Sequence, residues 1–178
     1  MKAFIFDTET TGLIPNSVLS LGQQPRIIEF YGCLIDDQTG EQISEVEFFA
    51  NPGAPIEPII TKITGIKDSD LAGQPPFSAN ADAVRSLVEA ADVVVAHNLS
   101  FDMAMVENEF ARIPADLRWP PRRICTVEQS EWYLGHRLNL TGLHEHLFGE
   151  PFAGAHRARH DVAALASCYL EMVKRRDA

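Results

Sequence analysis

Two acidic residues near the start of the chain have the type and spacing of metal ligands. Asp7 and Glu9 follow the apolar run 3–6. Alternate side chains of a β-strand share one face, so both carboxylates should point the same way. Their mutual repulsion would be relieved by a hard divalent cation such as Mg²⁺, which prefers oxygen ligands. The alternative is a solvated strand end followed by a turn, and the rest of the chain has to distinguish the two.

Two further acidic residues could join this pair. Asp102 stands where an apolar run, 92–96, turns into an expected helix, and Asp161 stands at the start of the last helix. Each has a structural alternative, because an acid in a first helical turn stabilises the helix dipole. If the sheet brings all four carboxylates together, they need counter-ions. Two divalent ions about 4 Å apart then form a two-metal catalytic site for phosphodiester cleavage, in which one ion activates water and the other stabilises the leaving oxygen.

A histidine near the last acid could serve as the general base. His156 precedes Asp161 by five residues, about 140° around an ideal helix, so it should lie on the preceding loop and reach in from the side. The ordinary histidine pKa of about 6.5 suits removal of a proton near neutral pH. An exposed loop histidine is the alternative reading. His97 and His160 are competing candidates, whereas His136, His144 and His146 are expected at the surface.

The elements that must position these residues follow from periodicity and turn signals. Strands are expected at 2–7, 26–35, 45–50 and 92–96, with a hairpin turn at 36–40. Helices are expected at 79–90, from Ser100 as N-cap to 111, at 126–132, at 140–147 and over a last segment whose apolar stripe spans 162–173. Pro-rich loops flank 59–66, and 113–123 is expected to be a loop. A hairpin followed by strand–helix alternation predicts an α/β fold with a central mixed sheet, antiparallel early strands and parallel later ones, flanked by helices.

Composition limits the setting of this chemistry. The 178 residues fit one domain, 1–178, and 46% hydrophobic residues with no run near the length of a membrane span predict a globular protein without a membrane partner. Three scattered cysteines and no signal-peptide pattern favour a cytoplasmic location. The net charge of −10 opposes nucleic-acid binding unless bound cations concentrate positive charge at the site.

Three motifs carry a resemblance to a known family. Phe-Asp-Thr-Glu-Thr-Thr-Gly-Leu (6–13), Ala-His-Asn-x-x-Phe-Asp (96–102) and His-Arg-Ala-x-x-Asp (156–161) resemble the exonuclease motifs of the DEDDh 3′→5′ exonucleases. That group includes RNase T and the proofreading subunit of the bacterial replicative polymerase, and its fold is ribonuclease H-like. A sister group carries tyrosine four residues before the last aspartate, where this chain has Arg157. The histidine subclass is therefore expected.

The resemblance implies roles by position. Asp7, Glu9 and Asp161 match direct ligands of two Mg²⁺ or Mn²⁺ ions, Asp102 matches the fourth metal-site carboxylate, and His156 matches the general base. Thr10, Thr11, Gly12 and Leu13 match positions that hold the 3′ nucleotide, and His97, Asn98 and Phe101 match positions lining the same cleft. Asn98 could instead only shape the turn, and Phe101 could be core.

The expected activity is release of nucleoside 5′-monophosphates from nucleic acid 3′ ends, with single-stranded DNA favoured. The alternatives are an exoribonuclease and a silent module that binds nucleic acid or a polymerase; a DNA polymerase is a further candidate partner, and both monomer and homodimer fit. The loop 14–25 is longer than usual in the family, and Cys125 stands where relatives often have aspartate. The basic residues that could follow a nucleic-acid backbone are scattered and receive no assignment: Lys62, Arg122, Arg123, Arg137, Arg157 and Arg159.

Overall fold

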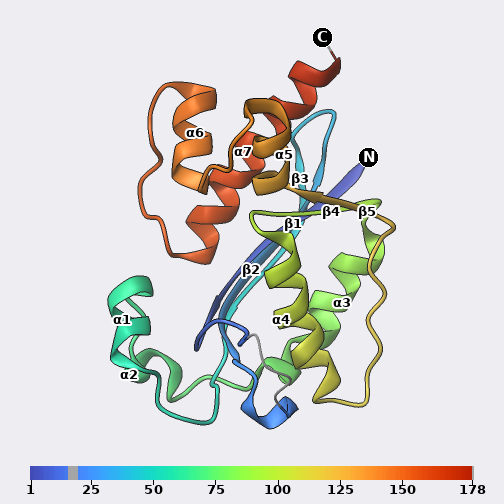
Figure 1. The fold of residues 1–178 in the computed structure, drawn as a ribbon. Coiled ribbons are helices and arrows are strands. Elements are labelled where there is room, and N and C mark those ends of the chain that lie inside the picture. Colours follow the sequence, from blue (N-terminus) through green and yellow to red (C-terminus); the bar gives the residue numbers. More distant parts are fainter. Residues whose placement is uncertain (16–19, 178) are drawn as a thin grey trace.

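A mixed β-sheet forms the centre of the protein in the computed structural model, which describes residues 1–15 and 20–177 (Figure 1). Its strands are β1 (Lys2–Thr10), β2 (Ile27–Asp36), β3 (Gln42–Phe49), β4 (Val93–Ala96) and β5 (Arg122–Cys125). They lie in the order β3-β2-β1-β4-β5; β1, β2 and β3 are antiparallel neighbours, whereas β4 runs parallel to both β1 and β5. The expected α/β class with a mixed sheet is confirmed.

Helices cover both faces of this sheet, and the first two helices pack in a separate small cluster with Ile28 of β2. The helices are α1 (Pro58–Thr64), α2 (Asp68–Leu71), α3 (Ala81–Ala90), α4 (Leu99–Ala111), α5 (Thr126–Leu134), α6 (Leu140–Phe148) and α7 (Ala158–Asp177), with short 3₁₀ turns at Leu21–Gln23 and Phe77–Ala79. Helices α3 and α4 contribute to the core on one face, and α6 and α7 contribute to the core on the other. Within the described residues, no helix is both long enough and apolar enough to cross a membrane.

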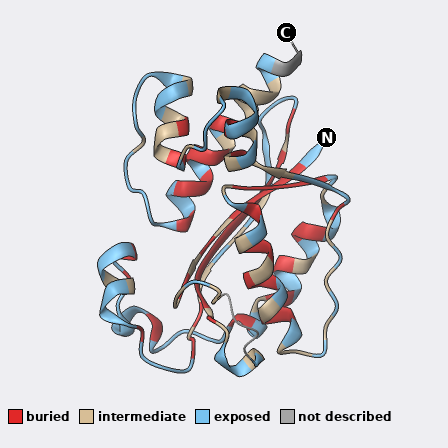
Figure 2. Ribbon diagram, in the orientation of Figure 1, coloured by how far each residue is buried: buried red, intermediate tan, exposed pale blue. Residues whose placement is uncertain are grey.

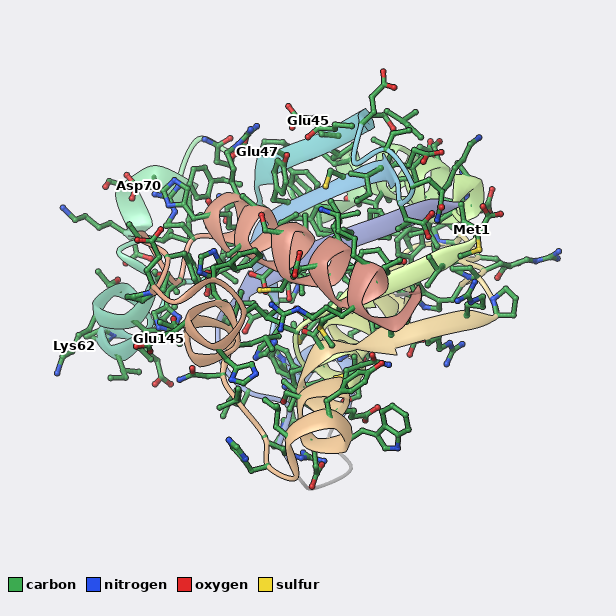
Figure 3. All side chains as sticks on the ribbon, turned by 90° about the horizontal axis from the view of Figure 1, so that it is seen from above. Met1, Glu45, Glu47, Lys62, Asp70 and Glu145 are labelled. Atoms are coloured by element: carbon green, nitrogen blue, oxygen red, sulfur yellow. The ribbon has the colours of Figure 1, made fainter. Side chains whose placement is uncertain are left out.

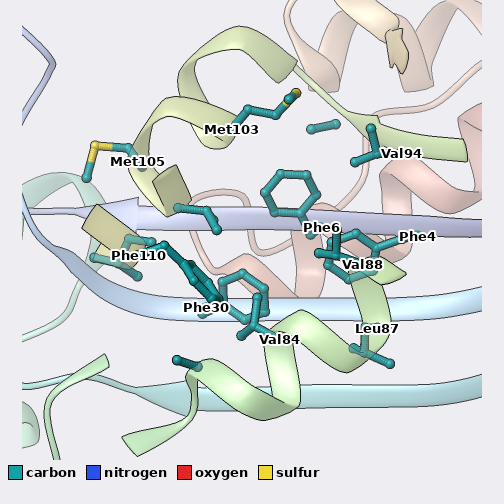
Figure 4. Packing of buried hydrophobic residues seen from close by; sticks show 14 of the residues in the cluster. Phe4, Phe6, Phe30, Val84, Leu87, Val88, Val94, Met103, Met105 and Phe110 are labelled. Carbon is teal, nitrogen blue, oxygen red and sulfur yellow. The ribbon is translucent and has the colours of Figure 1, made fainter. Parts of the chain in front are cut away.

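Strand β1 supplies both halves of the core, because its side chains alternate between the faces. Phe4 and Phe6 join the cluster under α3 and α4, and their rings stack at 5.1 Å (Figure 4). Ala3 and Ile5 join the cluster under α7. Burial is therefore concentrated along the sheet and on the inner faces of the helices (Figure 2). This double-sided packing fixes the direction in which each later residue of β1 points.

Several boundaries differ from the sequence expectations. Ser100 is not the N-cap of its helix: it lies inside α4, and Asn98 takes the cap position. The expected loop 113–123 runs into a strand, β5, whose exposed residues Arg122 and Arg123 show no apolar alternation and which is defined by pairing with β4. A helix, α1, occupies most of 59–66, for which no element was expected, and β3 begins at Gln42, three residues early. Part of the loop 14–25, residues 16–19, lies outside the described residues.

Candidate active site

The two carboxylates of β1 stand beyond the end of the neighbouring strand. Residues Ala3–Ile5 of β1 pair with Val93–Val95, after which β4 ends while β1 continues to Thr10. Asp7 and Glu9 share the strand face of Ala3 and Ile5, which is the face covered by α7. They are only half-buried, in contrast with the fully buried residues before them. The mismatch in strand length therefore opens a space at the carboxyl end of β4, where these side chains lie.

Asp102 reaches the same edge from the other face. Its carboxylate oxygen Oδ1 accepts two hydrogen bonds from Thr8, one from the backbone N–H at 3.2 Å and one from the hydroxyl at 2.8 Å. Thr8 is buried and its side chain points opposite to those of its neighbours Asp7 and Glu9. Because a buried backbone N–H needs a partner, Asp102 satisfies a donor that β4 no longer reaches. The two hydrogen bonds between Thr8 and Asp102 therefore hold the start of α4 against β1.

The turn between β4 and α4 has an uncommon backbone. Asn98 adopts φ 74°, the left-handed region that asparagine tolerates better than most residues, and the helix begins at the next residue. Asn98 is exposed and lines the cleft, so this one residue both shapes the turn and borders the site. The structural role that the sequence left open for Asn98 is thus present.

The start of α7 brings the last two predicted residues to the site. His156 lies on the preceding loop, as expected, and has φ 68°. Its backbone N–H donates to Asp161 Oδ2 at 3.0 Å. One ligand atom each from Glu9, His156 and Asp161 all lie within 4.8 Å of one another, close enough to share a cation. His156 is exposed, whereas Asp161 is 9% exposed.

These side chains line one cleft of about 420 Å³. It contains Asp7, Glu9, Asp102, His156 and Asp161, together with the expected substrate positions Leu13, His97, Asn98 and Phe101. Thr10, Thr11 and Gly12 do not line it: the Thr10 hydroxyl donates to the Gly12 carbonyl, and the Thr11 hydroxyl accepts the Arg26 N–H. Sequence reasoning missed several lining residues: Thr8, Asn139, Leu140, Thr141, Phe152 and Ala155. Only Asn139 carries a local signal, as the N-cap of α6.

The cleft gathers carboxyl groups whose pKa values are raised. Burial, followed by the charge of Asp102 and Glu9, raises the pKa of Asp7 well above its ordinary value. Burial and neighbouring carboxylates raise the pKa of Glu9 to about 8, and burial raises that of Asp102 to about 7 against the bonds from Thr8. The pKa of Asp161 is also raised, chiefly by burial. Two half-buried and two buried carboxyl groups whose pKa values are all raised form an environment that a bound cation would stabilise.

The competing histidines differ from His156. Burial lowers the pKa of His97 to about 4, so its ring is neutral near pH 7, and Nδ1 lies 2.8 Å from the buried Thr126 hydroxyl. His160 is exposed, does not line the cleft and has Nδ1 at 3.1 Å from the Gly154 carbonyl oxygen. His156 is therefore the exposed cleft histidine next to the carboxylates.

Comparison with known proteins gives a family match over most of the chain. A family model described as an exonuclease, RNase_T, matches residues 4–169. The PolC-type DNA polymerase III of Bacillus subtilis is 30% identical, over 96% of this chain and 11% of the polymerase. That of Halalkalibacterium halodurans is 31% identical over the same shares. The chain thus spans about a tenth of the length of these curated relatives.

Solved structures share the fold. Exonuclease X in complex with 5′ overhanging duplex DNA has a TM-score of 0.71 and 22% identity, over 99% of this chain and 93% of that one. The nuclease domain of 3′hExo, a DEDDh family member bound to rAMP, has a TM-score of 0.75 and 19% identity, over 98% and 92%. At these identities the likeness shows the sheet-and-helix arrangement.

Proposed function

The chain belongs to the RNase_T exonuclease family, as its three motifs indicated, and on that premise we propose that it removes nucleotides from the 3′ end of nucleic acid by hydrolysis. The observation that carries this proposal is the convergence of Asp7, Glu9, Asp102, His156 and Asp161, from three distant segments, in one cleft. We propose further that residues 1–178 act as one exonuclease domain. The three cysteines are free, which fits a reducing, cytoplasmic setting.

The donor set fits two hard divalent cations, Mg²⁺ or Mn²⁺. Asp7, Glu9 and Asp161 offer carboxylate oxygens on the α7 side, and Asp102 offers one from α4. The raised pKa values of these groups support the fit, because positive charge is what the cleft lacks. When bound, the ions would activate a water molecule and stabilise the leaving oxygen.

His156 would accept the proton of the attacking water. The water oxygen forms a bond to phosphorus, the bond from phosphorus to the 3′ oxygen of the preceding nucleotide breaks, and that oxygen takes up a proton from the solvent. The released nucleotide keeps its 5′-phosphate. The exposed position of His156 at the rim of the cleft supports this role, because the proton can pass from the ring to bulk water.

We favour single-stranded DNA ends as the substrate. The named relatives at 30% identity or above are DNA polymerases, so a polymerase is also the favoured context for this domain. Leu13 is 82% exposed beside the carboxylates, available to contact a terminal base. An exoribonuclease is the second candidate, because a neighbour of similar fold recognises the 3′ end of a histone mRNA stem-loop.

A time course on 3′- and 5′-labelled DNA and RNA oligonucleotides of one sequence tests the proposal. We expect loss of the 3′ label first, release of 5′-monophosphates, faster turnover of DNA and no reaction in EDTA. Asp7→Ala should be inactive, whereas Asp82→Ala, on the exposed side of α3, should match the wild type. Shortening from the 5′ end, or equal activity in Asp7→Ala, would contradict the proposal. Tight binding without turnover in Mn²⁺ would favour the silent module.

A further inference from the structure

A fifth buried carboxylate lies beside the cleft without lining it. Glu29 is on β2, where the strand register pairs it with Glu9 of β1, and its side chain is 3% exposed. Instead of the cleft, Glu29 borders a separate cavity of about 370 Å³ together with Phe49 and Asn80. Burying a charged side chain is costly unless it is paired, so its partners indicate its role.

The partners of Glu29 all belong to the segment that carries His156. Arg157 Nε lies 3.2 Å from both carboxylate oxygens, and Arg157 Nη2 donates to Oε1 at 2.9 Å. The backbone N–H of Ala158, the first residue of α7, donates to Oε2 at 3.2 Å. The guanidinium also lies 5.5 Å from the centre of the Phe49 ring. Such a fork of charged hydrogen bonds fixes orientation as well as distance.

His156 therefore lies between two anchors. Its own N–H is held by Asp161, and the two residues that follow it are held by Glu29. The φ of 68° at His156 is uncommon for a residue with a side chain, and such a conformation persists only where the surroundings impose it. Removing one anchor should let the loop relax and move the ring away from the carboxylates.

We propose that Glu29 and Arg157 form a positioning pair that holds His156 at the cleft, and that neither binds metal or nucleic acid. The pair acts through His156, so this inference rests on the proposed function. It also removes Arg157 from the basic residues that could follow a nucleic-acid backbone. Arg159, two residues further on, is likewise paired, with Glu45 and Glu47. Both glutamates lie on β3 and are labelled in Figure 3.

A double-mutant cycle tests whether the pair acts through the histidine. Glu29→Gln and Arg157→Gln are compared with the wild type on a 3′-labelled oligonucleotide, alone and in a His156→Ala background. We expect kcat to fall about 10- to 100-fold, as for a misplaced catalytic group. KM should not change, and neither substitution should add to the loss in His156→Ala. Mn²⁺ affinity, measured by titration calorimetry, should change far less than in Asp7→Ala, because Glu29 acts on the cleft carboxylates only through its charge.

Each alternative gives a different result that would overturn the proposal. Equal losses in the wild-type and His156→Ala backgrounds would mean that the pair acts on something else. A loss of Mn²⁺ binding in Glu29→Gln as large as that in Asp7→Ala would make Glu29 part of the metal site. A higher KM with unchanged kcat in Arg157→Gln would make Arg157 a substrate contact. Glu29→Gln leaves only the half-exposed Arg157 unpaired, so Glu29→Gln should fold even if Arg157→Gln, which strands the buried carboxylate of Glu29, does not.

A metal-free measurement separates this inference from the proposed function. Backbone amide order parameters of Ala155 and His156, measured by NMR in EDTA, should fall in Arg157→Gln. The matched control is Glu47→Gln, which removes an ion pair to α7 at Arg159 and leaves Glu29 bound. Unchanged order parameters in Arg157→Gln would refute the positioning pair. If the wild type cleaves no oligonucleotide, the proposed function fails and these order parameters still decide the positioning.

Discussion

Removing the charge of Asp102 should stabilise the metal-free protein at pH 8 while abolishing its activity. The pKa of Asp102 is raised from 3.8 to about 7, chiefly by burial. At about 1.36 kcal/mol per pH unit, the ionised group costs about 4 kcal/mol of folding free energy at pH 8. In Asp102→Asn, Oδ1 can still accept both bonds from Thr8. The buried amide N–H₂ costs about 1–3 kcal/mol, so the net gain should be about 1–3 kcal/mol.

The pH dependence of this gain has a definite sign. A carboxyl whose pKa is raised on folding binds its proton more tightly in the folded state than in the unfolded state. The protonated carboxyl of Asp102 therefore makes its full contribution to the stability of the wild type below pH about 3.8. The wild type loses that contribution as the pH rises to about 7. At pH 5 the cost is only about 2 kcal/mol, because pH 5 lies only about one pH unit above the ordinary carboxyl pKa of 3.8. The advantage of Asp102→Asn should disappear there.

Urea unfolding in EDTA at pH 5 and pH 8 measures the gain in unfolding free energy and its dependence on pH. In a thermal scan, each kcal/mol would correspond to about 2–4 °C in Tm for a chain of this size. The matched control is Glu109→Gln. Glu109 is equally buried but accepts bonds from Arg26 Nε at 2.8 Å and from the Ile27 N–H, so its neutralisation should destabilise at pH 8. The electrostatic reasoning is refuted if Asp102→Asn is less stable than the wild type at pH 8, or if its gain is the same at pH 5.

Three further outcomes are expected. Added Mg²⁺ should raise the Tm of the wild type at pH 8 and leave that of Asp7→Asn nearly unchanged, as scanning calorimetry with and without EDTA would show; equal shifts would argue against a cation at Asp7. His156→Ala should reduce kcat about 10²- to 10⁴-fold with KM and Mn²⁺ affinity retained, measured by steady-state kinetics and titration; a lost affinity would make the histidine a ligand. Gly154→Ala should lose more than about 1–2 kcal/mol in urea unfolding, because φ is 82° and the new Cβ would lie 2.2 Å from His160 Nδ1, whereas Gly73→Ala, with open space around it, is the control.

Local pattern was sufficient for the residues whose role depends on their own segment. The apolar run before Asp7 identified β1, the run 92–96 identified β4, and the stripe of the last helix identified α7. Spacing also placed His156 on a loop rather than on the helix, which the structure confirms. The three motifs sufficed to indicate the family. These inferences held because strand and helix periods are properties of neighbouring residues.

Local pattern failed where a distant partner determines the structure. Strand β5 escaped notice because pairing with β4, and not alternation of its own side chains, makes it a strand. Ser100 has the chemistry of an N-cap, but the left-handed turn at Asn98 starts the helix two residues earlier than Ser100 would. The two Thr8 hydrogen bonds to Asp102 join residues 94 positions apart, so no window along the chain contains both.

The sequence by itself identified the residues proposed to carry the chemistry: four carboxylates, one histidine and the order in which they occur. Only the tertiary structure decided how they are held. Glu29 and Arg157 are 128 positions apart, and an isolated glutamate on β2 gives no sign that it fixes the loop of His156. The physical reason is that long-range contacts arise when packed layers bring distant segments together, so they are a property of the assembled sheet and helices rather than of any segment.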